Sequence, residues 1–418
     1  MNLPIRQSTL KVVFSRRMLV AFLMGFSGGL PLLLTIGVLQ AWMKEGGVDL
    51  TWIGMITLVQ IPYTWKFLWA PFLDRFIPPF LGRRRGWLLM SQIALMASIV
   101  ALGYSDPVRN ILMMVVAAVL VAFFSATQDI VIDAYRREDL PDEELGLGSS
   151  MYVYGYRLGM LLAGGGGMIL ADAIPFSQVY FIMALCLLPG VVTTLLTPEP
   201  KVVAGLPQTM KEAVINPMVD YFSRSGAIWI LTFILLYKIG DTMASAITTP
   251  FFLEIEFSKT EIGTVVKFFG TAATLTGAAL GGLLLLKLGI NRGLWIFGIL
   301  QALSTAGFAV LARIGYNISM LAGVIAFENL SSGMGTAAFV AFMASITNKK
   351  FTATQYALLT SLMGLPRALA SSVTGVVAKN FGWENFFILC TLIAIPGMLL
   401  LLKFAPWNSK VPGEARAV

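Results

Sequence analysis

The chain has 418 residues, of which 57% are hydrophobic and only 12% are charged, and its formal net charge is +8. Ordinary globular domains carry roughly 25% charged residues, so this composition excludes a conventional soluble protein. It favours an all-α membrane protein, because lipid offers no partners to an unpaired backbone. A basic excess also occurs in nucleic-acid-binding proteins, but its placement along this chain fits membrane orientation better.

Apolar segments long enough to cross a bilayer follow one another along the whole sequence, since one helical span needs about 20 residues. Twelve candidates begin near Met18, Thr51, Trp87, Ile111, Ser150, Val179, Ala227, Glu261, Gly293, Met320, Ala353 and Phe386. The longest polar interruption runs from about Thr197 to Ser225. The sequence therefore predicts two six-helix bundles, 1–196 and 226–418, joined by a cytoplasmic linker at 197–225.

The basic residues predict the orientation of these spans. Most of the 30 Lys and Arg fall in the two tails and in the loops that follow even-numbered spans. Positively charged loops stay in the cytoplasm, so we expect both termini there. The first apolar run, from Met18 to Met43, is too long for a cleavable signal peptide.

Residues for metal binding or catalysis are scarce. Histidine is absent and the two cysteines, Cys186 and Cys390, lie in the sixth and twelfth spans, where we interpret them as apolar packing residues. We expect no disulfide, metal or cofactor. An enzyme would need a nucleophile and a base, and the usual base is missing, so we do not expect an enzyme. Proton chemistry would fall to carboxylates.

Charged residues inside the apolar spans repeat between the two halves. Three in the first half have counterparts roughly 200 positions later: Lys66, Asp129 and Arg157 correspond to Lys267, Glu328 and Arg367. A charge at the bilayer centre costs roughly 2.5–3.5 kcal/mol on insertion scales, so such residues usually line a pathway. Two homologous halves that each contribute charges to one site are typical of secondary transporters.

Three buried carboxylates are candidates for proton coupling: Asp129, Glu328 and Asp241. We expect Asp129 to pair with Arg157, because both lie at similar depth in adjacent spans. Burial and a nearby cation shift a carboxyl pKa in opposite directions, so a balanced carboxyl can bind and release a proton. A permanent salt bridge that fixes the two helices is the alternative. Lys238 and Asp241, three residues apart, are candidates to neutralise each other.

Buried cations outnumber buried anions, which favours an anionic substrate, and arginine grips carboxylates bidentately. Amide and aromatic side chains near the pathway suit a polar, sugar-like ligand, although Trp and Tyr also gather at membrane interfaces. The candidate substrate-binding residues are Lys66, Arg157, Lys238, Arg367, Gln40, Gln128, Asn329, Trp65 and Tyr154.

The loop after the second span resembles a superfamily signature. Major facilitator superfamily members carry Gly-x-x-x-Asp-Arg-x-Gly-Arg-Arg here, and the stretch from Ala70 to Arg85 matches it with a short insertion around Pro78-Pro79. Two parallel six-helix repeats are that superfamily's architecture, which is therefore the expected fold. The candidate residues for conformational gating are Gly28, Gly29, Asp74, Arg83, Arg84 and Asp133.

Further motifs resemble the AmpG muropeptide permeases across nearly all spans. They include Gly28-Gly29-Leu30-Pro31, Lys66-Phe67-Leu68-Trp69-Ala70-Pro71, Gln128-Asp129-Ile130-Val131, Gly155-Tyr156-Arg157-Leu158-Gly159, Tyr237-Lys238-Ile239-Gly240-Asp241 and Phe327-Glu328-Asn329-Leu330. Some members continue past the twelfth span, whereas this sequence ends soon after Lys410; we expect core transport to survive that difference.

The resemblance implies a function and a location. The family uses the proton motive force to import N-acetylglucosaminyl-1,6-anhydro-N-acetylmuramic acid, with or without its stem peptide, across the inner membrane of Gram-negative bacteria. That import feeds peptidoglycan recycling and influences β-lactamase induction. The expected partners are thus the anhydromuropeptide or its anhydro disaccharide, protons and the bilayer, with no nucleic acid; a monomer suffices for rocking of two domains. A related importer of another cargo, such as a siderophore, is the alternative.

Overall fold

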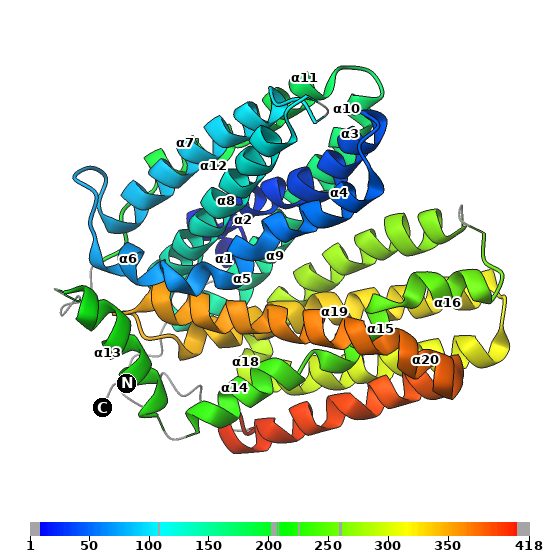
Figure 1. The fold of residues 1–418 in the computed structure, drawn as a ribbon. Helices are drawn as coiled ribbons and strands as arrows, with labels where there is room; N and C mark the ends of the chain where they lie inside the picture. Colours follow the sequence, from blue (N-terminus) through cyan, green and yellow to red (C-terminus); the bar gives the residue numbers. More distant parts are fainter. Residues whose placement is uncertain are drawn as a thin grey trace. The chain divides into compact units, whose positions relative to one another are not determined.

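The computed structural model of the chain describes residues 9–107, 109–201, 207, 209–224, 226–258 and 261–407, and every regular element in this part is a helix (Figure 1). A helix satisfies its own backbone hydrogen bonds, which is what a lipid environment requires. The predicted all-α class is confirmed.

Both parts of the chain contain long helices and short, interrupted ones, and the two longest of the described helices lie in the second part. Up to residue 222 they are α1 (Thr9–Val13), α2 (Arg16–Leu33), η1 (Leu34–Val38), α3 (Leu39–Glu45), α4 (Leu50–Met55), η2 (Ile56–Gln60), α5 (Ile61–Trp65), η3 (Lys66–Leu68), α6 (Ala70–Arg75), α7 (Arg83–Gly103), α8 (Ile111–Asp139), η4 (Asp142–Glu144), α9 (Leu145–Leu161), η5 (Leu162–Gly166), α10 (Gly167–Ala171), α11 (Phe176–Leu185), α12 (Leu188–Leu196) and α13 (Met210–Phe222). The later helices are α14 (Ala227–Leu236), α15 (Ile239–Ala246), α16 (Thr248–Glu254), η6 (Ile262–Phe269), α18 (Gly270–Ile314), α19 (Ile318–Ile346) and α20 (Thr352–Phe404).

These helices form two compact units that are not simple halves of the sequence. Unit 1 comprises Met1–Pro141, Met151–Pro217 and Thr347–Leu358. Unit 2 comprises Asp142–Ser150, Met218–Ile346 and Leu359–Val418. The start of α20 therefore belongs to unit 1 and the start of α9 to unit 2. The division into 1–196, 197–225 and 226–418 stays a prediction.

Eight helical stretches in the described part of the chain are long and apolar enough to cross a membrane. They are Arg16–Glu45, Arg83–Gly103, Ile111–Asp139, Phe176–Leu196, Ala227–Glu254, Ile262–Ile314, Ile318–Ile346 and Thr374–Phe404. The second and fifth predicted spans fall on the interrupted helices α4–α6 and α9–α10, and the eleventh on the first part of α20. The stretch Ile262–Ile314 holds two predicted spans, so the arrangement agrees with twelve.

Two glycines bend continuous helices into separate spans. Gly289 in α18 has φ 75° and Gly382 in α20 also has φ 75°. A positive φ is accessible to glycine because it lacks a Cβ atom. Gly289 thus separates the eighth span from the ninth, and Gly382 separates the eleventh from the twelfth.

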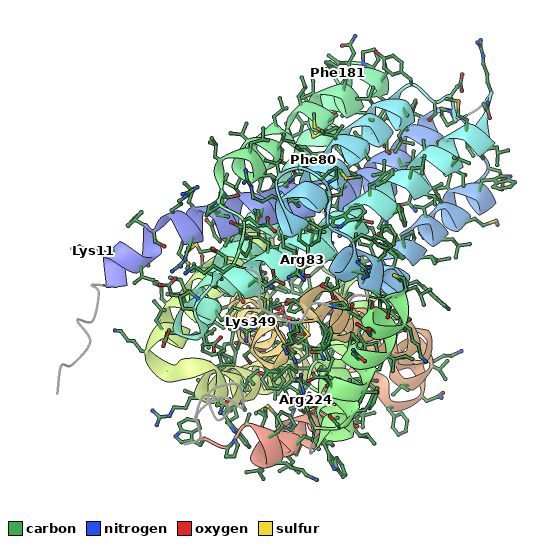
Figure 2. The ribbon with its side chains drawn as sticks, turned by 90° about the vertical axis from the view of Figure 1, so that its left-hand side faces the viewer. Lys11, Phe80, Arg83, Phe181, Arg224 and Lys349 are labelled. Atoms are coloured by element: carbon green, nitrogen blue, oxygen red, sulfur yellow. The ribbon has the colours of Figure 1, made fainter. Side chains whose placement is uncertain are left out.

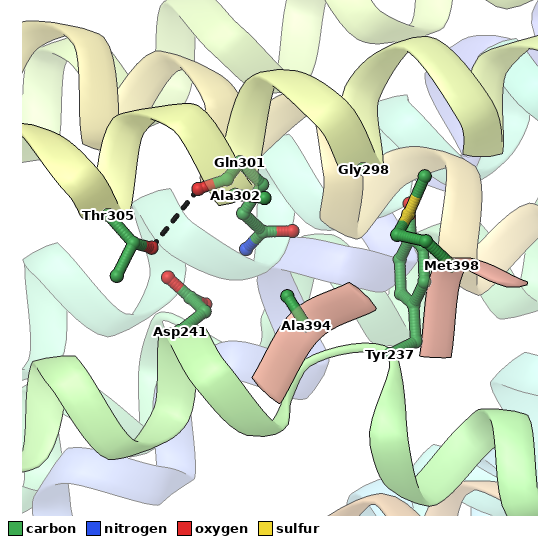
Figure 3. A pocket seen from close by; sticks show the side chains of 8 residues that line it. All are labelled: Tyr237, Asp241, Gly298, Gln301, Ala302, Thr305, Ala394 and Met398. Atoms are coloured by element: carbon green, nitrogen blue, oxygen red, sulfur yellow. Dashed lines mark hydrogen bonds between the residues drawn. The ribbon is translucent and has the colours of Figure 1, made fainter. Parts of the chain in front are cut away.

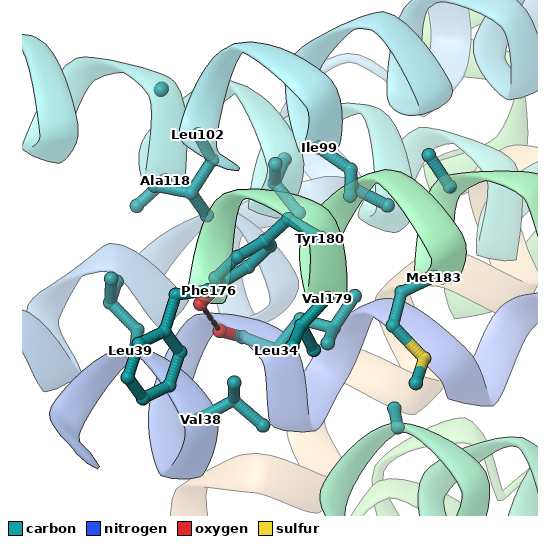
Figure 4. Close-up of a cluster of buried hydrophobic side chains, with 14 of the residues drawn as sticks. Leu34, Val38, Leu39, Ile99, Leu102, Ala118, Phe176, Val179, Tyr180 and Met183 are labelled. Carbon is teal, nitrogen blue, oxygen red and sulfur yellow. Dashed lines mark hydrogen bonds between the residues drawn. The ribbon is translucent and has the colours of Figure 1, made fainter. Parts of the chain in front are cut away.

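The core of unit 1 is a dense apolar cluster with one buried polar contact. Leu34, Val38, Ile99 and Val179 all have less than 1% of their surface exposed, and the Tyr180 hydroxyl donates to the Leu34 carbonyl at 2.8 Å (Figure 4). The outer surface is apolar too: Phe181, on the same α11 helix, is 47% exposed and points outward (Figure 2). Because lipid is as apolar as the core, close packing rather than water exclusion holds these helices together.

The core of unit 2 is aromatic. Phe251 and Phe387 meet with ring centroids 4.8 Å apart and nearly edge to face, and Phe308 packs on Phe387 at 5.2 Å. Cys390 is buried in this cluster, and Cys186 and Cys390 are both free thiols. Cys390 thus packs as a small apolar side chain, as expected.

A capping box begins the helix that precedes α18. The Glu261 carboxylate accepts the Ser258 backbone N–H and hydroxyl, each at 2.8 Å, and the Ser258 hydroxyl oxygen accepts the Glu261 N–H. The Tyr316 hydroxyl also donates to Glu261 at 2.6 Å. These donors, Tyr316 foremost, lower the pKa of the Glu261 carboxyl below its ordinary value.

Glycines allow α2 and α9 to approach each other closely within unit 1. An added Cβ atom at Gly25 or Gly29 would overlap the backbone carbonyl of Tyr152 or Tyr156. In return, a Cβ atom at Gly155 would overlap the backbone of α2 at Phe22. Small residues at such a seam let two backbones pack without intervening side chains.

We predict that Gly155→Ala destabilises the protein by about 1–3 kcal/mol, because the new methyl group has to displace backbone rather than a side chain. Thermal unfolding of the purified protein measures this. Gly37→Ala is the matched control, because nothing lies within 4 Å of a Cβ atom at Gly37. Equal unfolding temperatures for the two variants would contradict the tight seam.

Candidate functional site

The second half of α8 carries a buried polar face inside unit 1. Asp129 is 5% exposed and Asp133 is 4% exposed, and both were predicted as site residues. Because they are four residues apart, their side chains lie on one face of the helix about one turn from each other. Gln128 is fully buried beside them and accepts a hydrogen bond from the Ser27 hydroxyl at 3.4 Å.

Lys66 faces these carboxylates from a break in the second span. The α-helix is interrupted at Trp65–Trp69, where the short turn η3 replaces it. Lys66 is only 7% exposed and lies close enough to act electrostatically on both Asp129 and Asp133. The structure thus brings together three predicted residues from two distant segments.

Asp129 is incompletely satisfied within this cluster. Its Oδ1 atom is buried and has no hydrogen-bond partner among the described residues. Tyr63, Tyr152 and Tyr156 lie near it, and a Cβ atom at Gly28 would come within 3.0 Å of Oδ1. A buried carboxylate oxygen with no donor is costly, so it marks a place where a proton or a ligand donor is favoured.

The predicted pair between Asp129 and Arg157 stays a prediction. The cation that acts on Asp129 is Lys66, whereas Arg157 is half-buried on α9. On that helix Tyr156 takes the position near Asp129.

A second charged cluster in unit 1 centres on Arg84 at the start of α7. Its guanidinium is fully buried, with Nη2 2.7 Å from Asp74 Oδ1 and 2.6 Å from Glu138 Oε1. Arg83, labelled in Figure 2, also reaches Glu138 Oε1 at 3.0 Å. Two carboxylates therefore compensate two arginines, so these candidate gating residues form one network.

Asp74 also binds the N-terminus of α20. Its carboxylate accepts the backbone N–H groups of Ala353 at 3.3 Å and Thr354 at 2.9 Å, and the Thr354 hydroxyl at 2.8 Å. The first N–H groups of a helix lack intrahelical partners and lie at the positive end of its dipole, so a carboxylate is favoured there. This contact ties the 347–358 segment to the rest of unit 1.

Arg136 links Asp133 to the same segment. Its Nη2 atom lies 3.1 Å from Asp133 Oδ1 and 2.8 Å from the Tyr356 hydroxyl oxygen, and its guanidinium lies 4.4 Å from the Tyr152 ring centroid. Arg136 and Glu138 were not predicted as site residues. At the end of a span they look like ordinary loop charges. Arg136 follows Asp129 and Asp133 at helical spacing, which is its one sequence signal, whereas Glu138 lies on another face of the helix.

The predicted site residues of unit 2 do not form one cluster of contacts in the part of the chain that the structure describes. The Lys238 Nζ atom donates to Thr336 Oγ1 at 2.6 Å, and Asp241 lines a small cavity against α18. Mutual neutralisation of Lys238 and Asp241 stays a prediction. Asn329 Oδ1 accepts from Thr274 at 2.7 Å. Glu328 is half-buried on α19.

The remaining predicted residues are scattered. Gln40 donates to the Ile53 carbonyl at 3.2 Å, Tyr154 is half-buried and Trp65 is 53% exposed. Lys267 was expected inside an apolar stretch but near enough to its end to reach the interface; it is exposed and lies near the start of its span. The Arg367 side chain lies outside the residues whose side chains the structure describes.

We predict that Glu138→Gln destabilises the protein by about 3 kcal/mol, because it leaves two buried arginines with one carboxylate. Asp106→Asn is the control, since the Asp106–Arg109 pair is exposed and should contribute at most about 1 kcal/mol. Thermal unfolding of both variants measures the difference. A Glu138→Gln protein as stable as the control would mean that the Arg84 network contributes no stability.

Comparison with known proteins identifies similar chains. A family model of the Major Facilitator Superfamily matches residues 17–371. The anhydromuropeptide permease of Escherichia coli K12 is 44% identical over 94% of this chain and 80% of its own length. An uncharacterised Haemophilus influenzae protein is 43% identical over 94% of this chain and 96% of its own. A putative transporter AmpG 1 of Rickettsia bellii is 32% identical over 93% and 98%.

Solved structures share the fold at low identity. The fucose:proton symporter of E. coli has a TM-score of 0.72 with 13% identity, covering 94% of this chain and 98% of that one. The human organic anion transporter MFSD10 has a TM-score of 0.66 with 14% identity, covering 95% and 100%.

Proposed function

This chain belongs to the Major Facilitator Superfamily and within it to the AmpG-type permeases, and we propose that it imports anhydromuropeptides by proton symport. The cargo would be N-acetylglucosaminyl-1,6-anhydro-N-acetylmuramic acid, with or without its stem peptide, taken from periplasm to cytoplasm across a Gram-negative inner membrane. The observation that supports this choice of substrate is the 44% identity, over 94% of the chain, to a protein named anhydromuropeptide permease.

Asp129 is the proposed proton-coupling carboxylate of unit 1. It is buried, it has an Oδ1 atom without a donor, and its compensating cation is a lysine. Protonation neutralises this carboxylate and removes the cost of holding a charge in the membrane. A flexible lysine that moves away in one conformation would favour proton uptake, and its return would favour release.

The Arg84 network is the proposed gate. With both termini in the cytoplasm, α6, the start of α7 and the start of α20 lie at the cytoplasmic end of the spans. Opening of this end requires Asp74 to release Ala353 and Thr354. Exposed N–H groups and a carboxylate can be hydrated there, so the contact is reversible even though it is buried in this conformation.

We predict that Asp129→Asn abolishes uphill accumulation of the labelled anhydro disaccharide in proteoliposomes with an imposed proton gradient. Exchange of labelled for unlabelled cargo without a gradient should persist, because binding and alternation remain. Asp106→Asn, at an exposed pair, should behave as wild type. Full accumulation by Asp129→Asn would contradict a role of Asp129 in proton coupling. If the folded wild type shows neither uptake nor exchange, the anhydromuropeptide is not its substrate and the siderophore-type alternative remains.

We predict that Arg367→Ala weakens transport of the peptide-bearing cargo more than that of the bare disaccharide, because arginine binds the stem-peptide carboxylates bidentately. Competition uptake with the two cargoes measures the ratio. Arg313→Ala serves as the control, since Arg313 is exposed near the end of α18. Equal losses for both cargoes would argue against a carboxylate-binding role.

A further inference from the structure

A small polar cavity lies inside unit 2, between α15, α18 and α20. Asp241, Gln301 and Thr305 form its polar side, and Ala394 and Met398 contribute to its apolar wall (Figure 3). The space open to the centre of a water molecule is about 10 Å³. Sites for drug-sized ligands occupy about 300–1,000 Å³, so this cavity excludes a disaccharide and fits about one water molecule.

Gln301 supplies a hydrogen-bond donor that nothing in the described protein accepts. Its side chain is 4% exposed, and its Nε2 atom is buried without a partner. A Cβ atom at Gly335 would lie 2.7 Å from Gln301 Oε1, so the glycine lets the amide oxygen approach α19. In Figure 3 the amide nitrogen points toward the side of the cavity where the Asp241 carboxylate lies.

The other polar groups around Asp241 are already engaged elsewhere. The Thr305 hydroxyl donates to the Gln301 carbonyl at 3.1 Å. The Tyr237 hydroxyl donates to the Leu294 carbonyl at 2.9 Å, and Lys238 donates to Thr336. Cys390, on α20, is buried in the aromatic cluster. The Gln301 amide is thus the donor that faces the cavity with its hydrogens unused.

We propose that one water molecule occupies this cavity, accepts a hydrogen bond from Gln301 Nε2 and donates one to the Asp241 carboxylate. A water satisfies both groups at once, whereas a bare metal cation would meet the positive end of the amide N–H dipole. Resting on the proposed proton symport, this water is also the group through which Asp241 receives and releases its proton. Asp241 then serves unit 2 as Asp129 serves unit 1.

Infrared difference spectra of the full-length protein in H₂¹⁶O and H₂¹⁸O test the water site without cargo. We expect an isotope-sensitive O–H band of a hydrogen-bonded internal water in the wild type. The band should disappear in Gln301→Met, which keeps the side-chain length, and in Asp241→Asn it should shift. Gln92→Met is the matched control, because Gln92 is a fully buried glutamine of unit 1 whose Nε2 also lacks a partner; it should keep the band.

Stability provides a second measurement of the same water. If the cavity holds water, Gln301→Met removes the donor that holds this water, so Asp241 loses its hydrogen-bonded partner and the unfolding temperature falls. If the cavity is dry, Gln301→Met removes an unsatisfied donor and raises that temperature. A higher unfolding temperature, or a band unchanged in both cavity variants, overturns the water site.

The coupling role has its own readout. Gln301→Met should lower gradient-driven accumulation several-fold while leaving exchange intact, and Gln92→Met should retain accumulation. Normal accumulation in a Gln301→Met protein that has lost the band overturns the proton role of this water. Failure of the wild type to transport anhydromuropeptide refutes the proposed function instead and leaves the infrared result standing.

Discussion

A charge buried among these helices has to be compensated within a few ångströms, because neither lipid nor a packed interior can solvate it. Arg84 satisfies this constraint with Asp74 and Glu138, and Asp74 in turn uses the N–H groups at the start of α20. Every partner in this network comes from a different segment of the chain. These polar contacts therefore hold segments that are distant in the sequence together at the end of unit 1.

Asp129 and Asp241 stand out against this background, because neither lies in such a network. Asp129 keeps an oxygen without a donor beside Lys66, and Asp241 faces a cavity with an unsatisfied amide. An unsatisfied buried group costs stability, so the Asp129 oxygen without a donor and the Gln301 amide without an acceptor beside Asp241 both favour a use for these sites. Proton binding is the simplest use, because it neutralises the charge without a new side chain.

The glycine seam between α2 and α9 makes the first of these sites possible. Because Gly25, Gly29 and Gly155 let the two backbones touch, Tyr152 and Tyr156 come near Asp129 while Gly28 lies against its carboxylate. A methyl group at the seam would push α9 outward and change the surroundings of Asp129. The close packing of α2 against α9 thus sets the surroundings of the Asp129 carboxylate.

The sequence by itself determined the membrane spans, the burial of Lys66 and Asp129 within them and the family, because apolar run length and residue type are properties of one segment at a time. It also placed Asp129 and Asp133 on one face, since helical spacing is local. Only the tertiary structure decided the partners that are visible: Lys66 acts on Asp129, and Lys238 donates to Thr336. The tertiary structure also identified Glu138 as a partner of Arg84 and Tyr356 as a partner of Arg136. The physical reason is that the rotation of one helix against its neighbour depends on close packing, which spacing along a single segment does not encode.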